Sequence, residues 1–167
     1  PACSDDADAS VLFIETSGCL PMCGHGTIGT VTAAIENAII TPKTPGQLVL
    51  DVPAGKIRIE YQQNGAKVEK VRIFNVPAYL AHAEVVVQVP ELGELVVDVS
   101  YGGNYYAIVD PQKNFAGLEH FTVDQILQLS PIVRRIVDEA VECVHPHDPT
   151  VRGVSHVLWT GTPSQPG

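Results

Sequence analysis

The first quarter of the chain contains a short apolar run followed by a longer one with helical spacing. Residues 10–15 (SVLFIE) are typical of a buried strand, because a short apolar run bounded by turn residues favours a strand over a helix. From Gly26 to about Ile40, apolar residues recur three or four positions apart, and most of the others are Gly, Thr or Ala. This pattern predicts a helix that is nearly apolar on all sides and lies within a core.

Alternating apolar and polar residues fill the middle of the chain. Such a period of two predicts strands, and Gly55 and the pair Asn64–Gly65 suit hairpin turns between the first of them. We therefore predict a mainly antiparallel sheet. The predicted strands cover residues 47–52, 56–62, 67–76, 83–89, 93–101 and 104–110.

A helical region and one more strand follow. Thr122 suits the N-cap of a helix, and Ser130–Pro131 suits the cap and first turn of a second one. Residues 154–160 (VSHVLWT) predict a last strand. The order of elements favours an α+β architecture with two related lobes, residues 1–80 and 81–167, the second of which is incomplete.

Composition narrows the classes of partner. The formal net charge is −9 and the ten Lys and Arg are scattered, which argues against nucleic acid. No apolar run approaches the roughly 20 residues that span a bilayer. We expect a soluble, cytoplasmic protein that binds a small molecule, with neither nucleic acid nor a membrane as partner.

The cysteines and histidines do not form a metal motif. Cys19 and Cys23 lie four residues apart, but no second pair has ligand spacing, so we expect no metal. The string CVHPHD (residues 143–148) resembles a ligand cluster, yet its prolines favour a solvated loop. His156 lies in an apolar strand, where a hydrogen-bonded core histidine is the default interpretation. The irregular spacing of all four cysteines predicts free thiols rather than disulfides: Cys3, Cys19, Cys23 and Cys143.

The glycine-rich turn before the first helix has three interpretations. Gly24, Gly26 and Gly29 match the G-x-G-x-x-G dinucleotide motif, with Asp51 further on, but no strand leads directly into the motif and hairpins follow Asp51. A second interpretation makes Cys23 a small core residue, which is common for cysteine.

The third interpretation makes Cys23 a reactive base. Unpaired amides and the helix dipole stabilise a thiolate at a helix N-terminus, and the same amides can hold a carboxylate. Gly24 and Gly26 would let a ligand approach the backbone. One turn would then bind a carboxylate and place a base beside it, as removal of the proton α to that carboxylate requires.

The octapeptide MCGHGTIG resembles the proline racemase family, and most closely its 4-hydroxyproline epimerases. Further segments match the family in order and approximate spacing, so that the resemblance covers essentially the whole chain. They are ACSDDADASVLFIETSGCLPMCGHGTIGTV, NVPAY, VDVSYGGNYYAIVD and SHVLWTG.

The resemblance implies a fold of the diaminopimelate-epimerase type, with two lobes that each wrap strands around a central helix. It implies catalysis without a cofactor, by two cysteines that act on opposite faces of the substrate Cα. Cys23 would be the first base, the backbone of Gly24 and His25 would hold the carboxylate, and His156 would lie near the substrate amine.

The family's second motif, resembling SPCGTGT, has no counterpart in this sequence. We therefore expect the middle portion of an isomerase acting on 4-hydroxyproline or proline, inactive by itself; a homodimer is compatible with this expectation. Two alternatives stay open. Relatives with Thr in place of the second cysteine dehydrate trans-3-hydroxyproline, and the chain could instead be a non-catalytic fragment that binds a prolyl carboxylate.

Overall fold

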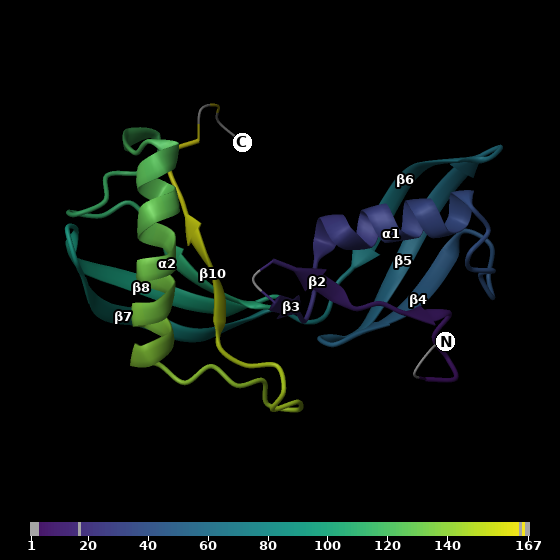
Figure 1. Cartoon of the computed structure of the whole chain (residues 1–167), viewed down its shortest axis with the longest axis horizontal. Helices are drawn as coiled ribbons and strands as arrows, with labels where there is room; N and C mark the ends of the chain where they lie inside the picture. Colours follow the sequence, from purple (N-terminus) through teal and green to yellow (C-terminus); the bar gives the residue numbers. More distant parts are fainter. Residues whose placement is uncertain (1–3, 17, 164, 166–167) are drawn as a thin grey trace. The chain divides into compact units, whose positions relative to one another are not determined.

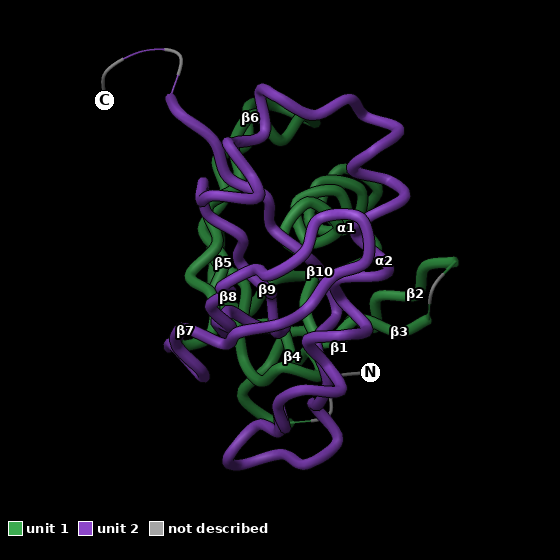
Figure 2. The backbone as a smooth tube through the Cα atoms, turned by 90° about the vertical axis from the view of Figure 1, so that its left-hand side faces the viewer, with its two compact units in different colours: residues 1–77 green, residues 78–167 purple. Residues whose placement is uncertain are grey.

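The computed structural model describes residues 4–16, 18–163 and 165, which form two compact units, residues 1–77 and 78–167 (Figures 1 and 2). Each unit combines a sheet with one α-helix, in agreement with the predicted α+β class. The assignment of residues 1–80 and 81–167 to lobes of a larger enzyme stays a prediction.

Unit 1 is a four-stranded sheet with one helix on it and a small hairpin beside it. The sheet order is β1-β4-β5-β6; β1 pairs with β4 in parallel and the other pairs are antiparallel. The core joins buried leucines and isoleucines of β4 and β5 to Met22 and to the inner face of the helix. The elements are β1 (Ala9–Ser10), β2 (Phe13–Glu15), β3 (Gly18–Leu20), α1 (Gly24–Glu36), β4 (Gln47–Val52), β5 (Gly55–Asn64) and β6 (Lys67–Phe74).

The prediction of one buried strand over residues 10–15 is wrong. The chain pairs with β4 through β1, and the amide of Val11 adds one hydrogen bond to the Asp51 carbonyl (2.9 Å). It then leaves the sheet and forms the separate two-stranded hairpin β2–β3. A two-stranded hairpin can bury only one side, and here Phe13 is buried while Ile14 is 76% exposed.

Helix α1 is shorter and less buried than predicted. It ends at Glu36 because Ala38 adopts a left-handed conformation (φ 52°), and the amides of Ala38 and Ile39 donate to the carbonyls of Ile35 and Ala34. This is a Schellman ending, which closes a helix. Only one face of the helix is buried, and Ile28 is exposed on the other.

The carboxylate of Glu36 ties the end of α1 to β6. It accepts hydrogen bonds from the Val68 amide (2.9 Å) and the Lys67 ammonium (3.0 Å). These two bonds, the amide first, lower the pKa of Glu36. The helix is thus fixed along the sheet at the end opposite to Cys23.

Unit 2 is a four-stranded sheet covered on one face by a long helix (Figure 1). The order is β10-β9-β8-β7, with β10 parallel to β9 and the other pairs antiparallel. The elements are β7 (Tyr79–Val89), β8 (Gly93–Tyr101), β9 (Tyr105–Val109), the 3₁₀ turn η1 (Leu118–His120), α2 (Val123–Ala140) and β10 (Val154–Trp159).

The helix of unit 2 is continuous through Pro131, where two helices were predicted. Thr122 is its N-cap, as predicted. Pro131 has no amide hydrogen, so the carbonyl of Leu127 lacks its helical donor. Leu127 is exposed, and water can replace that donor. Ser130 does not cap a second helix: its hydroxyl donates to the carbonyl of Ile126 (2.6 Å) and accepts from the indole of Trp159 (2.9 Å).

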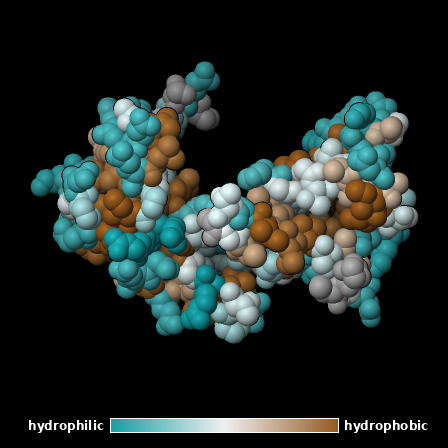
Figure 3. Space-filling view, in the orientation of Figure 1, coloured by the Kyte–Doolittle hydropathy of each residue, from teal (hydrophilic) through white to brown (hydrophobic). Residues whose placement is uncertain are grey.

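The surfaces of the two units differ in character. Apolar side chains gather on the visible face of unit 1, which contains α1, whereas the visible face of α2 is mainly polar (Figure 3). Within the described residues, no helix has the length and apolar character needed to cross a membrane. The exposed large apolar residues of unit 1 are Leu12, Ile14, Ile28 and Ile39.

Candidate active site

A short turn fixes Cys23 at the beginning of α1. After β3, the carbonyl of Pro21 accepts a hydrogen bond from the amide of Ala54 (3.0 Å), and Met22 inserts into the core of unit 1. Cys23 is the N-cap, with extended backbone angles (φ −140°, ψ 110°), and its side chain is half-buried. The chain on both sides of the thiol is therefore held by unit 1.

The N-terminus of α1 presents unpaired amides. The first intrahelical bond runs from Thr27 to the carbonyl of Cys23 (2.9 Å), so the amides of Gly24, His25 and Gly26 have no acceptor within the helix. Within the described part of the chain, no side chain caps this end and the first turn has no acidic residue. The positive end of the helix dipole is thus available to an anion.

The thiol of Cys23 lies inside the first turn. A Cβ placed on Gly26 would lie 3.0 Å from Sγ of Cys23 and 3.2 Å from Cδ1 of Phe13. The hydroxyl of the fully buried Thr27 donates to the Cys23 carbonyl (2.8 Å), the same oxygen that accepts its amide. The backbone of the thiol residue is therefore held twice by Thr27.

The imidazole of His25 lies beside the thiol. Sγ of Cys23 is 3.7 Å from Nδ1 and 3.6 Å from Nε2 of His25, so neither nitrogen is favoured as its partner. The ring is exposed to solvent. His25 thus offers two groups to the site, a backbone amide in the helix and a side chain next to Sγ.

The three glycines of the turn play different parts. A Cβ on Gly24 or Gly29 would meet no atom of the described residues within 4 Å, whereas one on Gly26 would collide with the thiol. Open space at Gly24 fits the prediction that a ligand approaches the backbone there. At Gly26 the space is taken by Cys23 and Phe13 instead.

His156 belongs to β10 in unit 2, and Cys23 belongs to unit 1. The ring of His156 stacks on Tyr106 (centroids 4.9 Å apart, planes at 15°), and its Nδ1 lies 2.9 Å from the Ser155 hydroxyl. The default interpretation as a hydrogen-bonded core histidine holds only in part, because the ring is paired with Ser155 but is only half-buried. It is paired with Tyr106, whose neighbours Tyr105 and Ala107 point to the opposite, buried face of the sheet.

The other cysteines show no comparable arrangement. Cys143 is buried, and burial, together with the charge of Asp138, raises the pKa of its thiol. Cys19 is exposed on β3, and Cys3 lies outside the described residues.

The segment CVHPHD (residues 143–148) is only partly the predicted solvated loop, because Cys143 is buried and His145 stacks on Tyr101. Among the described residues no group of three metal-ligating side chains comes together.

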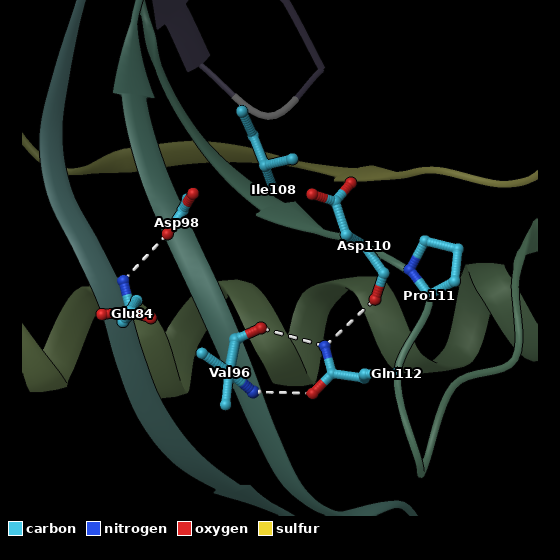
Figure 4. A pocket seen from close by; sticks show the side chains of 7 residues that line it. All are labelled: Glu84, Val96, Asp98, Ile108, Asp110, Pro111 and Gln112. Carbon is cyan, nitrogen blue, oxygen red and sulfur yellow. Dashed lines mark hydrogen bonds between the residues drawn. The ribbon is translucent and has the colours of Figure 1, made fainter.

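A separate depression of about 270 Å³ lies on the sheet of unit 2 (Figure 4). Much of its polar lining is already paired: Asp98 accepts from the amide of Glu84 (2.8 Å), and the Gln112 side chain bonds both the amide and the carbonyl of Val96. These polar groups of the depression are therefore engaged within the fold.

Sequence reasoning missed two residues that shape the thiol site. Thr27 lies four residues after Cys23, the spacing at which a threonine hydroxyl can reach a backbone carbonyl one turn earlier, so its contact was accessible from spacing alone. Phe13 contacts this turn because the β2–β3 hairpin folds back onto it. No local sequence pattern predicts that contact.

Comparison with known proteins agrees with this fold. The family described as proline racemase matches residues 1–167. The chain is 69% identical to a 4-hydroxyproline 2-epimerase of Shewanella loihica over 161 residues, covering 96% of this chain and 48% of that protein. It is 60% identical to the 4-hydroxyproline 2-epimerase of Spirosoma linguale, covering 93% and 47%. The chain spans about half the length of the curated relatives it matches.

Two solved structures share the fold. A probable proline racemase from Agrobacterium radiobacter, solved with bound carbonate, superimposes with a TM-score of 0.83 at 29% identity, over 94% of this chain and 46% of that one. A hydroxyproline epimerase from Agrobacterium vitis, solved with trans-4-hydroxy-L-proline, gives the same TM-score and coverage at 23% identity. The predicted epimerase-type fold is thereby confirmed. With a family match over its full length, the chain belongs to the proline racemase family.

Proposed function

We propose that this chain supplies the first catalytic half-site of a cofactor-independent epimerase that inverts the Cα of 4-hydroxyproline or proline. The observation that carries the proposal is the Cys23 thiol beside the unpaired amides of Gly24 and His25. The names of the relatives support the substrate class, because they are 4-hydroxyproline 2-epimerases.

The proposed chemistry is a proton transfer at carbon. The substrate carboxylate binds the amides of Gly24 and His25, which helps to stabilise the negative charge that develops when the Cα proton leaves. The thiolate of Cys23 takes that proton and becomes a thiol. A second acid on the opposite face returns a proton to Cα, which inverts the centre and leaves that second group deprotonated.

The second acid is expected outside this chain. Cys143 cannot serve, because it is buried and its raised pKa opposes ionisation. We propose that a cysteine of a further segment acts there, as the family resemblance implies. His156 is proposed to lie near the substrate amine; Nδ1 is engaged with Ser155, and among the described residues no hydrogen bond to Nε2 is present.

The test compares the complete protein with this chain. Trans-4-hydroxy-L-proline is incubated with each, and the products are separated by chiral chromatography, with Cα deuterium uptake from D₂O measured in parallel. The complete protein should epimerise, and the 167-residue chain should not, because loss of a positioned acid typically costs about 10²- to 10⁴-fold. Turnover by the chain alone would show that the second acid lies within it.

Two further outcomes separate the alternatives. Dehydration of trans-3-hydroxyproline without epimerisation would identify a dehydratase instead. Binding of pyrrole-2-carboxylate, a flat mimic of the deprotonated prolyl Cα, without any exchange or turnover in the complete protein would indicate a non-catalytic binding module.

A further inference from the structure

We infer that Gly26, the third residue of α1, positions the Cys23 thiol and thereby affects the rate of proton transfer. This role rests on the proposed function. The space left by its missing side chain is where Sγ lies. Any side chain at this position would displace the reacting atom while leaving the carboxylate-binding amides in place.

The distances show how little room there is. A Cβ on Gly26 would lie 3.0 Å from Sγ and 3.3 Å from Cβ of Cys23, and 3.2 Å from Cδ1 of Phe13. Non-bonded carbon atoms pack best at about 3.5–4.0 Å, and sulfur is larger than carbon. These contacts are tighter than most in proteins, so a methyl group fits only if Sγ or the Phe13 ring moves by a few tenths of an ångström.

The surroundings prevent the thiol from retreating with its backbone. The Cys23 carbonyl accepts both the amide (2.9 Å) and the hydroxyl (2.8 Å) of Thr27, and Met22 next to it is buried in the core. On the other side, Phe13 is buried and packs in the same cluster. The remaining freedom is rotation about the Cα–Cβ bond of Cys23, which moves Sγ away from the first turn.

Such a rotation should reduce the rate more than binding. A shift of about 1 Å in a reacting group can cost about 10²-fold, so a shift of a few tenths of an ångström should cost about tenfold. The amides of Gly24 and His25 keep their places in the helix, so the ground-state grip on the carboxylate is retained. The expected signature is a fall in kcat with little change in KM.

Gly29 supplies a matched control, because it lies in the same helix and a Cβ there meets nothing within 4 Å. Both Gly26→Ala and Gly29→Ala replace glycine by a better helix former. In the complete protein, Gly26→Ala should lower kcat by about tenfold with KM within about threefold, and Gly29→Ala should leave both unchanged. Equal kcat in Gly26→Ala and the parent, or an equal loss in both variants, would overturn the inference.

Iodoacetamide labelling of the complete protein separates this inference from the proposed function. Gly26→Ala should change the labelling rate of Cys23 by more than about threefold, while that of exposed Cys19 stays constant. If the parent protein lacks epimerase activity, the proposed function fails, but the labelling comparison still decides whether Gly26 sets the thiol's position; an unchanged Cys23 rate would refute it.

A double variant covers the case in which Gly26→Ala does not fold. Phe13→Leu in that background removes the ring atom that would lie 3.2 Å from the new methyl group, but not the collision with Sγ. The double variant should fold and keep the low kcat. Recovery of kcat would show that the ring, and not the thiol, was displaced, which contradicts the inference.

Discussion

The two α-helices of the chain begin in opposite ways. At α2, the Thr122 hydroxyl accepts from the amide of Gln125 (3.2 Å), the Gln125 side chain accepts from the amide of Thr122 (2.9 Å), and Asp124 lies in the first turn. At α1, Cys23 provides no cap and the first turn has no acid. A cap is typically worth about 1 kcal/mol. The chain thus forgoes this stabilisation at the helix end where we propose that a carboxylate binds.

The units also differ in the titratable groups of their interiors. In unit 2, Tyr101, Tyr105 and Cys143 are buried, and the hydroxyls of Tyr79 and Tyr105 lie 2.7 Å apart. The buried cluster of unit 1 consists of apolar side chains. The core of unit 2 therefore contains groups that ionise at alkaline pH, whereas the Cys23 thiol of unit 1 lies at the margin of an apolar core.

Removal of the thiol should have the largest effect. In the complete protein, Cys23→Ser should lower epimerisation by about 10²- to 10⁴-fold, because a serine hydroxyl is a far weaker base at neutral pH. Chiral chromatography measures the loss, and Cys19→Ser serves as control because that thiol is exposed on β3. Parental turnover by the Cys23→Ser variant would contradict the proposal that the thiol at the start of α1 takes the Cα proton.

Alkaline pH should destabilise unit 2 selectively. Burial first, and then the hydrogen bond with Tyr79, raise the pKa of Tyr105 above its ordinary value near 10; burial first also raises that of Tyr101. The native state then holds tyrosine protons that the unfolded state releases. The contribution of these two tyrosines to stability is therefore constant below about pH 10 and is lost above it, by at most about 1.4 kcal/mol per pH unit for each group.

Fluorescence can follow this loss, because Trp159 is the sole tryptophan of the chain and lies buried in unit 2. Urea midpoints from Trp159 emission should fall between pH 10 and 11. Labelling of Cys143 with iodoacetamide should rise with the unfolded fraction, since its thiol is buried. A midpoint that stays constant over this range would contradict the prediction.

Removal of the cap of α2 should have a smaller effect. Thr122→Ala leaves the Gln125 amide without its side-chain acceptor and should lower the free energy of unfolding of unit 2 by about 1 kcal/mol. Urea denaturation followed by Trp159 emission measures it. Thr41→Ala, at an exposed position of unit 1, should leave that transition unchanged. Equal midpoints for Thr122→Ala and the parent would mean that the capping box adds no stability.

Addition of a cap to α1 should have the smallest effect on stability, with the opposite sign. Cys23→Asp would supply a carboxylate to the unpaired amides and should stabilise α1 by about 0.5–1 kcal/mol while abolishing epimerisation. Amide hydrogen exchange at Thr27 and Val31 measures it locally. Faster exchange in Cys23→Asp would show that the natural N-terminus does not lack a favourable cap.

Much of the architecture was accessible from local patterns. The alternation in β4, β5 and β6, the turns at Gly55 and Gly65, and the Thr122 cap depend on neighbouring residues, and all were predicted. The end of α1 was not predicted, because the left-handed residue that closes the helix is usually glycine and here is Ala38.

The sequence by itself determined the reactive group, a cysteine followed by glycine-rich residues at the start of a helix. It also determined the periodicities of two and 3.6 that select strands and helices. Only the tertiary structure decided what each of those residues contacts. Phe13 reaches the turn of Gly26 through a hairpin, and Glu36 binds an amide 32 residues away. Such contacts depend on packing between segments that no local pattern encodes. The different surroundings of Gly24, which has open space beside it, and of Gly26, which lies against the Cys23 thiol, therefore follow only from the folded chain.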